Sequence, residues 1–164
     1  MKFLPAGERV QLGLHKSKTS GRREKRQVVM EFMMLLDGKK ISGIQTFIAD
    51  AWKGMRRVGS AQSMVELNRE VESQNAKFFT FPKDEDVRNE VTLRMEDVKL
   101  FDLRLEKIGN GEIVLYFKAV QPIGKNLWDW LFAAEQAEVL YAEFEECQTE
   151  LLKDEPHAMT ARVN

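Results

Sequence analysis

The sequence predicts an α+β fold: a curved antiparallel sheet of about five to seven strands, packed by two amphipathic helices. Apolar and polar residues alternate from 91 to 121, which predicts a β-meander. The apolar segment Val28–Leu36 predicts an interior strand covered on both sides. Apolar residues spaced three and four apart predict helices over about 43–55 and 126–137.

The length of 164 residues suits a single domain with its own core. We expect a basic, flexible arm over residues 1–26, one α+β domain over 27–152 and a frayed tail over 153–164. The single cysteine, Cys147, cannot form an intramolecular disulfide. No apolar run approaches the roughly 20 residues of a membrane span. These features predict a cytoplasmic protein without a membrane partner.

Charge is divided unevenly along the chain, although the net charge is only −1. Residues 1–57 hold 13 Lys/Arg and 5 Asp/Glu, whereas residues 58–164 hold 12 Lys/Arg and 21 Asp/Glu. Such asymmetry indicates either contact with nucleic acid or opposite charges that meet within the fold or between subunits.

The N-terminal arm contains one candidate strand and one flexible basic run. Val10, Leu12 and Leu14 alternate with polar residues, which suits a short edge strand. From Lys16 to Arg26 the chain is rich in Ser, Gly and Thr and carries six positive charges and one negative charge. Such a run is expected to be solvated or bound to an anion.

The first long strand is predicted over Val28–Leu36, where only Glu31 interrupts the apolar residues. Asp37-Gly38 then gives a turn signal. Ser42 is a candidate cap for the helix over about 43–55, whose apolar residues fall on one face. Lys39 and Lys40 follow the turn, and Arg56 and Arg57 follow the helix.

Residues 60–75 could form either a short helix or a strand, because their few apolar residues fit the spacing of both. Phe78, Phe79 and Phe81 before Pro82 predict a strand. A charged loop is expected from there to residue 89.

The predicted meander has strands near Val91–Met95, Val98–Ile108 and Glu112–Gln121. Glu96-Asp97 predicts a tight turn or a bulge, so the first two strands could be one bent strand. Gly109-Asn110-Gly111 supplies the positive φ that a tight hairpin needs.

The position at which the second helix ends decides whether the sheet has a further strand after it. Either the helix continues from residue 126 to about 152, or it ends near Ala137 and Val139–Cys147 forms a strand. We favour the strand, because Val-Leu-Tyr-Ala-Glu-Phe alternates and a further strand would cover an exposed edge.

Catalytic chemistry finds little support, and we predict no catalytic residues, no metal ligands and no cofactor. The histidines, His15 and His157, fall in segments predicted to be terminal, and Cys147 has no histidine near it in sequence. One cysteine and two remote histidines exclude a four-ligand zinc site. A metal-dependent nuclease using Asp84, Asp86 and the Asp97–Lys99 step is the third functional hypothesis.

Nucleic-acid binding is the leading hypothesis, in a protein that is not an enzyme. A basic arm and a basic strand–helix corner on one surface would neutralise phosphates, with a steep salt dependence. The candidate contacts are Lys16, Lys18, Arg22, Arg23, Lys25, Arg26, Lys39, Lys40, Arg56 and Arg57.

The alternative is a β-rich subunit that assembles into rings or tubes through complementary basic and acidic faces. Trp128 and Trp130 lie two residues apart on the second helix, so they cannot easily face one core together. They are therefore candidates for an interface with another copy of the chain or with a protein partner.

Overall fold

The computed structural model describes residues 9–21, 26–41, 43–57, 59–69, 71, 73–82 and 91–146. The tail expected over 153–164 and the charged loop expected over 83–89 lie outside these ranges.

Eight antiparallel strands and three helices make up the described part of the chain. The strands are β1 (Val10–Ser20), β2 (Gln27–Leu36), β3 (Met64–Leu67), β4 (Gln74–Pro82), β5 (Val91–Val98), β6 (Phe101–Lys107), β7 (Ile113–Pro122) and β8 (Ala137–Glu146). The helices are α1 (Gly38–Ile41), α2 (Thr46–Arg56) and α3 (Lys125–Gln136). The sheet order is β3-β6-β7-β2-β1-β8-β4-β5, so the sheet is open.

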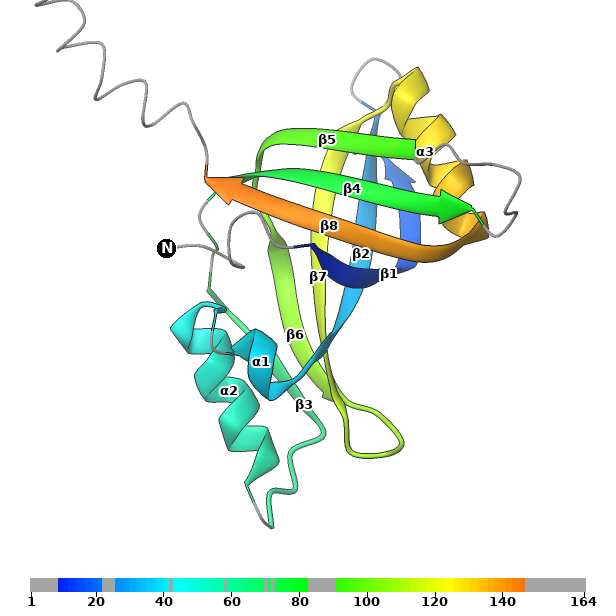
Figure 1. Ribbon diagram of the computed structural model, residues 1–164. Helices are drawn as coiled ribbons and strands as arrows, with labels where there is room; N and C mark the ends of the chain where they lie inside the picture. The colour runs from blue at the N-terminus through cyan, green and yellow to red at the C-terminus, as the bar shows by residue number, and fades with distance from the viewer. Residues whose placement is uncertain are drawn as a thin grey trace, which may run out of the picture.

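The sheet bends at β1 and folds over on itself (Figure 1). Residues 10–12 of β1 pair with β8, whereas residues 13–20 pair with β2. One half of the sheet, β8-β4-β5, therefore crosses over the other half, β2-β7-β6-β3. Phe32 on β2 and Phe78 on β4 stack with ring centroids 4.6 Å apart, although two strands separate them in the sheet order.

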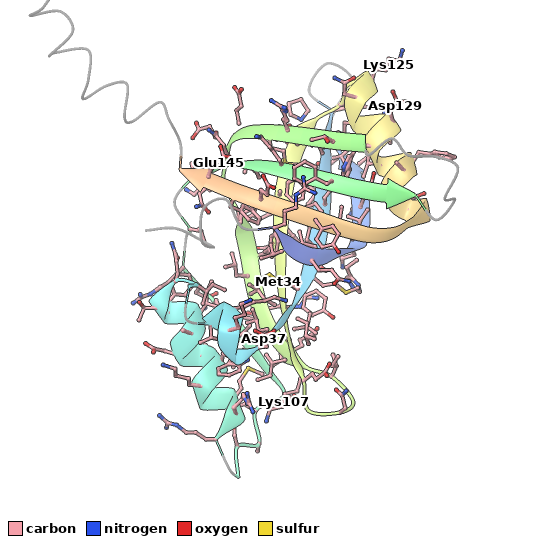
Figure 2. The ribbon with its side chains drawn as sticks, viewed as in Figure 1. Met34, Asp37, Lys107, Lys125, Asp129 and Glu145 are labelled. Carbon is pink, nitrogen blue, oxygen red and sulfur yellow. The ribbon has the colours of Figure 1, made fainter. Side chains whose placement is uncertain are left out.

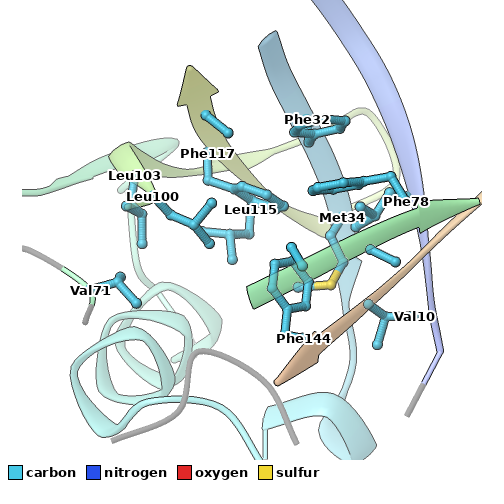
Figure 3. Packing of buried hydrophobic residues seen from close by; sticks show 14 of the residues in the cluster. Val10, Phe32, Met34, Val71, Phe78, Leu100, Leu103, Leu115, Phe117 and Phe144 are labelled. Atoms are coloured by element: carbon cyan, nitrogen blue, oxygen red, sulfur yellow. The ribbon is translucent and has the colours of Figure 1, made fainter. Parts of the chain in front are cut away.

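Aromatic side chains fill the space between the two halves (Figure 3). Phe32, Phe78, Phe117 and Phe144 are fully buried and contact one another at ring distances of 4.6 to 6.3 Å. Trp130 of α3 joins this cluster and packs edge-on against Phe32 and Phe78. Because the centre of the core is aromatic and comes from five different elements, its packing holds both halves of the sheet together.

The two longer helices each bury one face, as their apolar spacing predicts. In α2 the buried residues include Ile48, Trp52 and Met55. Its N-cap is Gln45, whereas the predicted cap, Ser42, lies outside the described residues. Within the ranges that the structure describes, no helix is long and apolar enough to cross a membrane.

The strand expected at Val10–Leu14 is present and is longer than predicted, because β1 continues to Ser20 through part of the run expected to be flexible. It is not an edge strand, since it pairs with both β2 and β8. Val10 and Leu12 are buried, and the polar residues that follow are held by backbone pairing with β2 rather than by side-chain burial. This strand, together with the short strand β3 over Met64–Leu67, brings the sheet to eight strands rather than five to seven.

The predicted meander is also corrected. β6 and β7 form the expected hairpin, but β5 pairs with β4 and has no register with β6. The predicted irregularity at Glu96-Asp97 is confirmed as a bulge, because the β4–β5 register shifts there and Asp97 has a φ of 51°. The chain passes from one half of the folded sheet to the other at residues 99–100. The predicted strand after the second helix is confirmed as β8.

Candidate functional site

The candidate site lies on the outer face of β1, β2, β7 and β6, the face turned away from the aromatic core. The strand registers place Lys16, Glu31 and Lys118 side by side across β1, β2 and β7. In the next row, Arg104 of β6 lies opposite Tyr116 of β7. Four adjacent strands therefore bring charged side chains from distant parts of the sequence onto one surface.

Glu31 is the centre of this surface. It lies on the outer side of β2, yet only 1% of it is exposed, because the side chains around it cover the carboxylate. Arg104 Nη1 donates to Glu31 Oε2 at 2.8 Å and Arg104 Nη2 to Glu31 Oε1 at 3.4 Å. Lys16 Nζ lies 3.9 Å from Oε1 and His15 Nε2 lies 3.8 Å from it.

Two opposing influences act on the pKa of Glu31. Burial is the largest and raises it, because a desolvated carboxylate is costly to ionise. The hydrogen bond and charge of Arg104, with the charges of Lys16 and Lys118, outweigh burial and leave the pKa below its ordinary value. Glu31 is therefore held as a carboxylate, which makes it an ion-pair partner and not a proton donor at neutral pH.

Arg104 is fixed in place by an aromatic ring as well as by Glu31. Its guanidinium carbon lies 4.1 Å from the centroid of Tyr116, which is a cation–π distance. His15 packs edge-on against the same ring, with centroids 5.2 Å apart. Glu106 Oε2 lies 3.7 Å from Arg104 Nε.

A bulge in β6 borders the cluster at Asp102. The register between β6 and β7 shifts between Phe101 and Arg104, and Asp102 has a φ of 50°. A non-glycine residue with positive φ is uncommon, and bulges often re-aim side chains beside functional surfaces. Here the bulge lets Asp102 Oδ2 accept a hydrogen bond from Lys118 Nζ at 3.0 Å.

Beside the bulge lies a hollow of about 630 Å³, where β3 ends and leaves the start of β6 uncovered. Four positively charged side chains and two carboxylates line this hollow, so the net charge of its rim is positive. Its charged lining residues are Glu66, Arg69, Lys99, Asp102, Arg104 and Lys118. A rim of this composition suits an anionic group better than a cation.

Of the predicted nucleic-acid contacts, two lie directly on β1. Lys16 and Lys18 are exposed, and they occupy the part of β1 that pairs with β2 alone. Arg26 is exposed next to the start of β2, and its carbonyl accepts a hydrogen bond from Ile123 N at 3.2 Å. Arg22, Arg23 and Lys25 lie outside the described residues.

The second predicted basic group lies beyond the end of β2 that is far from the β1–β2 connection. Lys39 and Lys40 lie in α1, after the far end of β2, and Arg56 and Arg57 close α2 nearby (Figure 1). β2 is ten residues long, which separates its two ends by about 30 Å. Lys16 and Lys18 lie opposite Glu31 and Val29, so part of β2 separates them from Lys39 and Lys40.

The two predicted interface tryptophans have opposite environments. Trp130 is fully buried, and its Nε1 donates to the Phe78 carbonyl at 3.1 Å. Trp128 is 48% exposed on the other side of α3. Trp130 is thus a core residue and not an interface residue, since the inward face of α3 meets the aromatic cluster.

Metal chemistry gains no support from the described ranges, which contain no grouping of three or more His, Cys, Asp or Glu that could hold an ion. Asp97 and Lys99 of the nuclease hypothesis lie at the end of β5 and just beyond it, with Asp97 at a φ of 51°. Asp84, Asp86, Cys147 and His157 lie outside the described residues.

The Glu31–Arg104 pair is the feature that sequence reasoning missed. The sequence shows Glu31 as the single acidic residue within the apolar segment Val28–Leu36. A charge buried in such a strand requires a partner. The partner could not be named, because Arg104 lies 73 residues away. Comparison with known protein families, curated proteins and solved structures finds no match.

Proposed function

We propose that the protein is a non-enzymatic binding protein that contacts nucleic acid electrostatically through the basic segment joining β1 and β2. The observation that carries this proposal is the exposure of β1 from His15 to Ser20, where only β2 pairs with the strand. Lys16 and Lys18 alternate with Ser17 and Thr19 there, so both lysines occupy the outer face. The sequence adds Arg22, Arg23, Lys25 and Arg26 directly afterwards.

The outer face of the sheet extends this basic segment. Neighbouring strands lie about 4.8 Å apart, so the path from β1 across β2 and β7 to β6 is about 14 Å long. Lys16, Lys118 and Arg104 lie along it, and the hollow with Arg69 and Lys99 lies at its end. Each strand of a DNA duplex carries one phosphate about every 3.4 Å of helix axis, so a path of this length can meet more than one phosphate.

The acidic residues on this face offset the cations that they contact. Glu31 and Glu106 lie beside Arg104, and Asp102 lies beside Lys118, so Lys18 and the basic segment after it carry the main positive charge. Binding is therefore expected to be weak, sequence-independent and strongly reduced by salt, as is usual where phosphate contacts supply the affinity.

The test is salt-dependent retention of the full chain on labelled single- and double-stranded oligonucleotides. Deleting residues 1–26 would not isolate the charges, because it removes β1, which pairs with both β2 and β8. Lys18→Ser with Arg22→Ser, Arg23→Ser and Lys25→Ser removes four charges and leaves the buried residues of β1 in place. The matched control removes four charges from α1 and the end of α2, beyond the other end of β2: Lys39→Ser, Lys53→Ser, Arg56→Ser and Arg57→Ser.

We expect the β1–β2 variant to lose affinity by more than about tenfold at low salt and to have a shallower salt slope. The control should retain most of the affinity. Equal losses in the two variants, or no retention of the unmodified chain at low salt, would contradict the proposal.

A second candidate, the self-assembling structural subunit, is favoured by the open sheet. β3 and β5 lie at its two ends, and each pairs with one described strand only. Unpaired edges are ready to accept a strand from another copy, and a head-to-tail contact of this kind makes rings or filaments. Light scattering at rising concentration tests it, since a ring or filament has more than two copies.

A further inference from the structure

The solvent side of α3 carries two large aromatic residues, and nothing in the described part of the chain packs over them fully. Trp128 is 48% exposed and Phe132 is 66% exposed. They lie four residues apart, so they are neighbours on one side of the helix. The opposite side of α3 is already used, because Leu127, Trp130 and Leu131 are buried in the core.

Two opposite charges bracket this aromatic pair. Lys125 precedes Trp128 by three residues and Glu135 follows Phe132 by three residues, and both are exposed. At about 3.6 residues per turn, all four residues fall within one stripe of about 80°. Lys125 projects away from the sheet at the start of α3, with Asp129 beside it (Figure 2). Spacings of three, four and three residues are those of the seam between paired helices.

The order of these residues is self-complementary under a two-fold axis. If two copies of α3 run antiparallel, with the axis opposite the midpoint between Trp128 and Phe132, each Trp128 faces Phe132 of the partner. The same axis sets Lys125 opposite Glu135 of the partner, and this pairing occurs twice. A parallel arrangement would instead set like charges against each other, which disfavours it.

We propose that the chain forms a symmetric homodimer through the Lys125–Trp128–Phe132–Glu135 stripe of α3. The contact is isologous, so it closes after two copies and does not build rings. It is independent of the nucleic-acid contact proposed above, because the stripe contains none of the residues assigned to that contact. α3 has 12 residues and is about 18 Å long, which makes this a small interface and predicts a reversible dimer.

The first experiment measures the dimer dissociation constant of the full chain by sedimentation equilibrium, from low micromolar to high micromolar concentration. Trp128→Ala and Phe132→Ala should each raise the constant by about tenfold or more, as central aromatic residues do. Leu35→Ala is the matched control, because Leu35 is also a large exposed apolar residue, at 42%, but lies on β2. A chain that stays monomeric throughout, or a dimer that neither α3 variant weakens, overturns the proposal.

The second experiment tests the antiparallel arrangement by charge exchange. Lys125→Glu should weaken the dimer, because it sets two glutamates against each other at both ends of the interface. Adding Glu135→Lys to the same chain should restore the dissociation constant, because each pair is then opposite in sign again. A double variant that is weaker than Lys125→Glu alone, or equal to it, overturns this arrangement.

Discussion

Arg104 reaches across a neighbouring strand to bind Glu31. β7 lies between β6, which carries Arg104, and β2, which carries Glu31, and the guanidinium passes over the Tyr116 ring on the way. The two hydrogen bonds, at 2.8 and 3.4 Å, end on a carboxylate that is almost completely buried. One ion pair thus spans three strands on the outer face of the sheet.

Removal of Arg104 should destabilise the fold strongly. Arg104→Met leaves Glu31 as a buried charge without its main partner, and breaking such a pair costs about 3–5 kcal/mol when both groups are buried. Because 23% of the Arg104 side chain is exposed, water can replace part of the contact, and we expect a loss of about 2–4 kcal/mol. Denaturant unfolding measures the free energy.

Glu31→Gln with Arg104→Met is the control for this prediction. Removing the charges from both partners relieves the unpaired carboxylate, so the double variant should be more stable than Arg104→Met alone. A double variant that loses the sum of the two single losses would show that the pair does not act as a unit.

The free energy of unfolding should decrease at acid pH because of Glu31. The pKa of Glu31 is lower in the folded chain than its ordinary value of 4.5, so the unfolded chain takes up the proton more readily. The stabilisation from Glu31 is therefore complete well above pH 4.5 and is lost as the pH falls from there through the lower folded pKa. Free energies of unfolding measured between neutral pH and about pH 3 should fall in this window.

The pKa of a second carboxyl, Asp37, is also lowered in the folded chain, so its contribution to the pH dependence must be separated from that of Glu31. The backbone N–H of Lys40 donates to Asp37 Oδ1 at 2.9 Å, which lowers the pKa of Asp37 below its ordinary value (Figure 2). Asp37→Asn should therefore remove only part of the acid dependence. If the Asp37→Asn variant loses the whole dependence, Glu31 is not its main source.

The two neighbouring tryptophans should respond very differently to substitution. Trp130→Ala opens a cavity in the aromatic core and removes the indole N–H that donates to the Phe78 carbonyl, at an expected cost of about 3–5 kcal/mol. Trp128→Ala, two residues away on the same helix, should change the unfolding free energy by less than about 1 kcal/mol. These values are measured at low protein concentration, where the proposed dimer is dissociated. Similar losses for both variants would contradict the placement of α3.

Local patterns in the sequence predicted most of the elements but not how they pair. Apolar residues alternate with polar ones on both sides of residue 100, and no glycine or proline marks a change. The structure nevertheless assigns β5 to one half of the sheet and β6 to the other. Pairing depends on contacts between distant segments, such as the β4–β8 register, and a period of two residues carries no information about them.

The polar second half of β1 was not predicted as a strand for a different reason. Its lysines, serines and threonine lack the apolar spacing that identifies a half-buried strand, so they predict a solvated arm. They form a strand because β2 offers a continuous row of backbone partners from Phe32 to Gln27. The basic character of the segment was predictable from sequence, and its pairing with β2 was not.

The hairpin between β6 and β7 offers a test in which only backbone conformation changes. Gly109 and Gly111 both have open space where a Cβ would lie, but only Gly111 has a positive φ, of 84°. The left-handed region costs a residue with a Cβ about 1–2 kcal/mol, so Gly111→Ala should destabilise the protein by about 1 kcal/mol. Gly109→Ala should be neutral or slightly stabilising, because alanine restricts the unfolded chain. Gly111→Asn should fall between them, since asparagine tolerates positive φ; equal losses at the two glycines in denaturant unfolding would contradict this explanation of the turn.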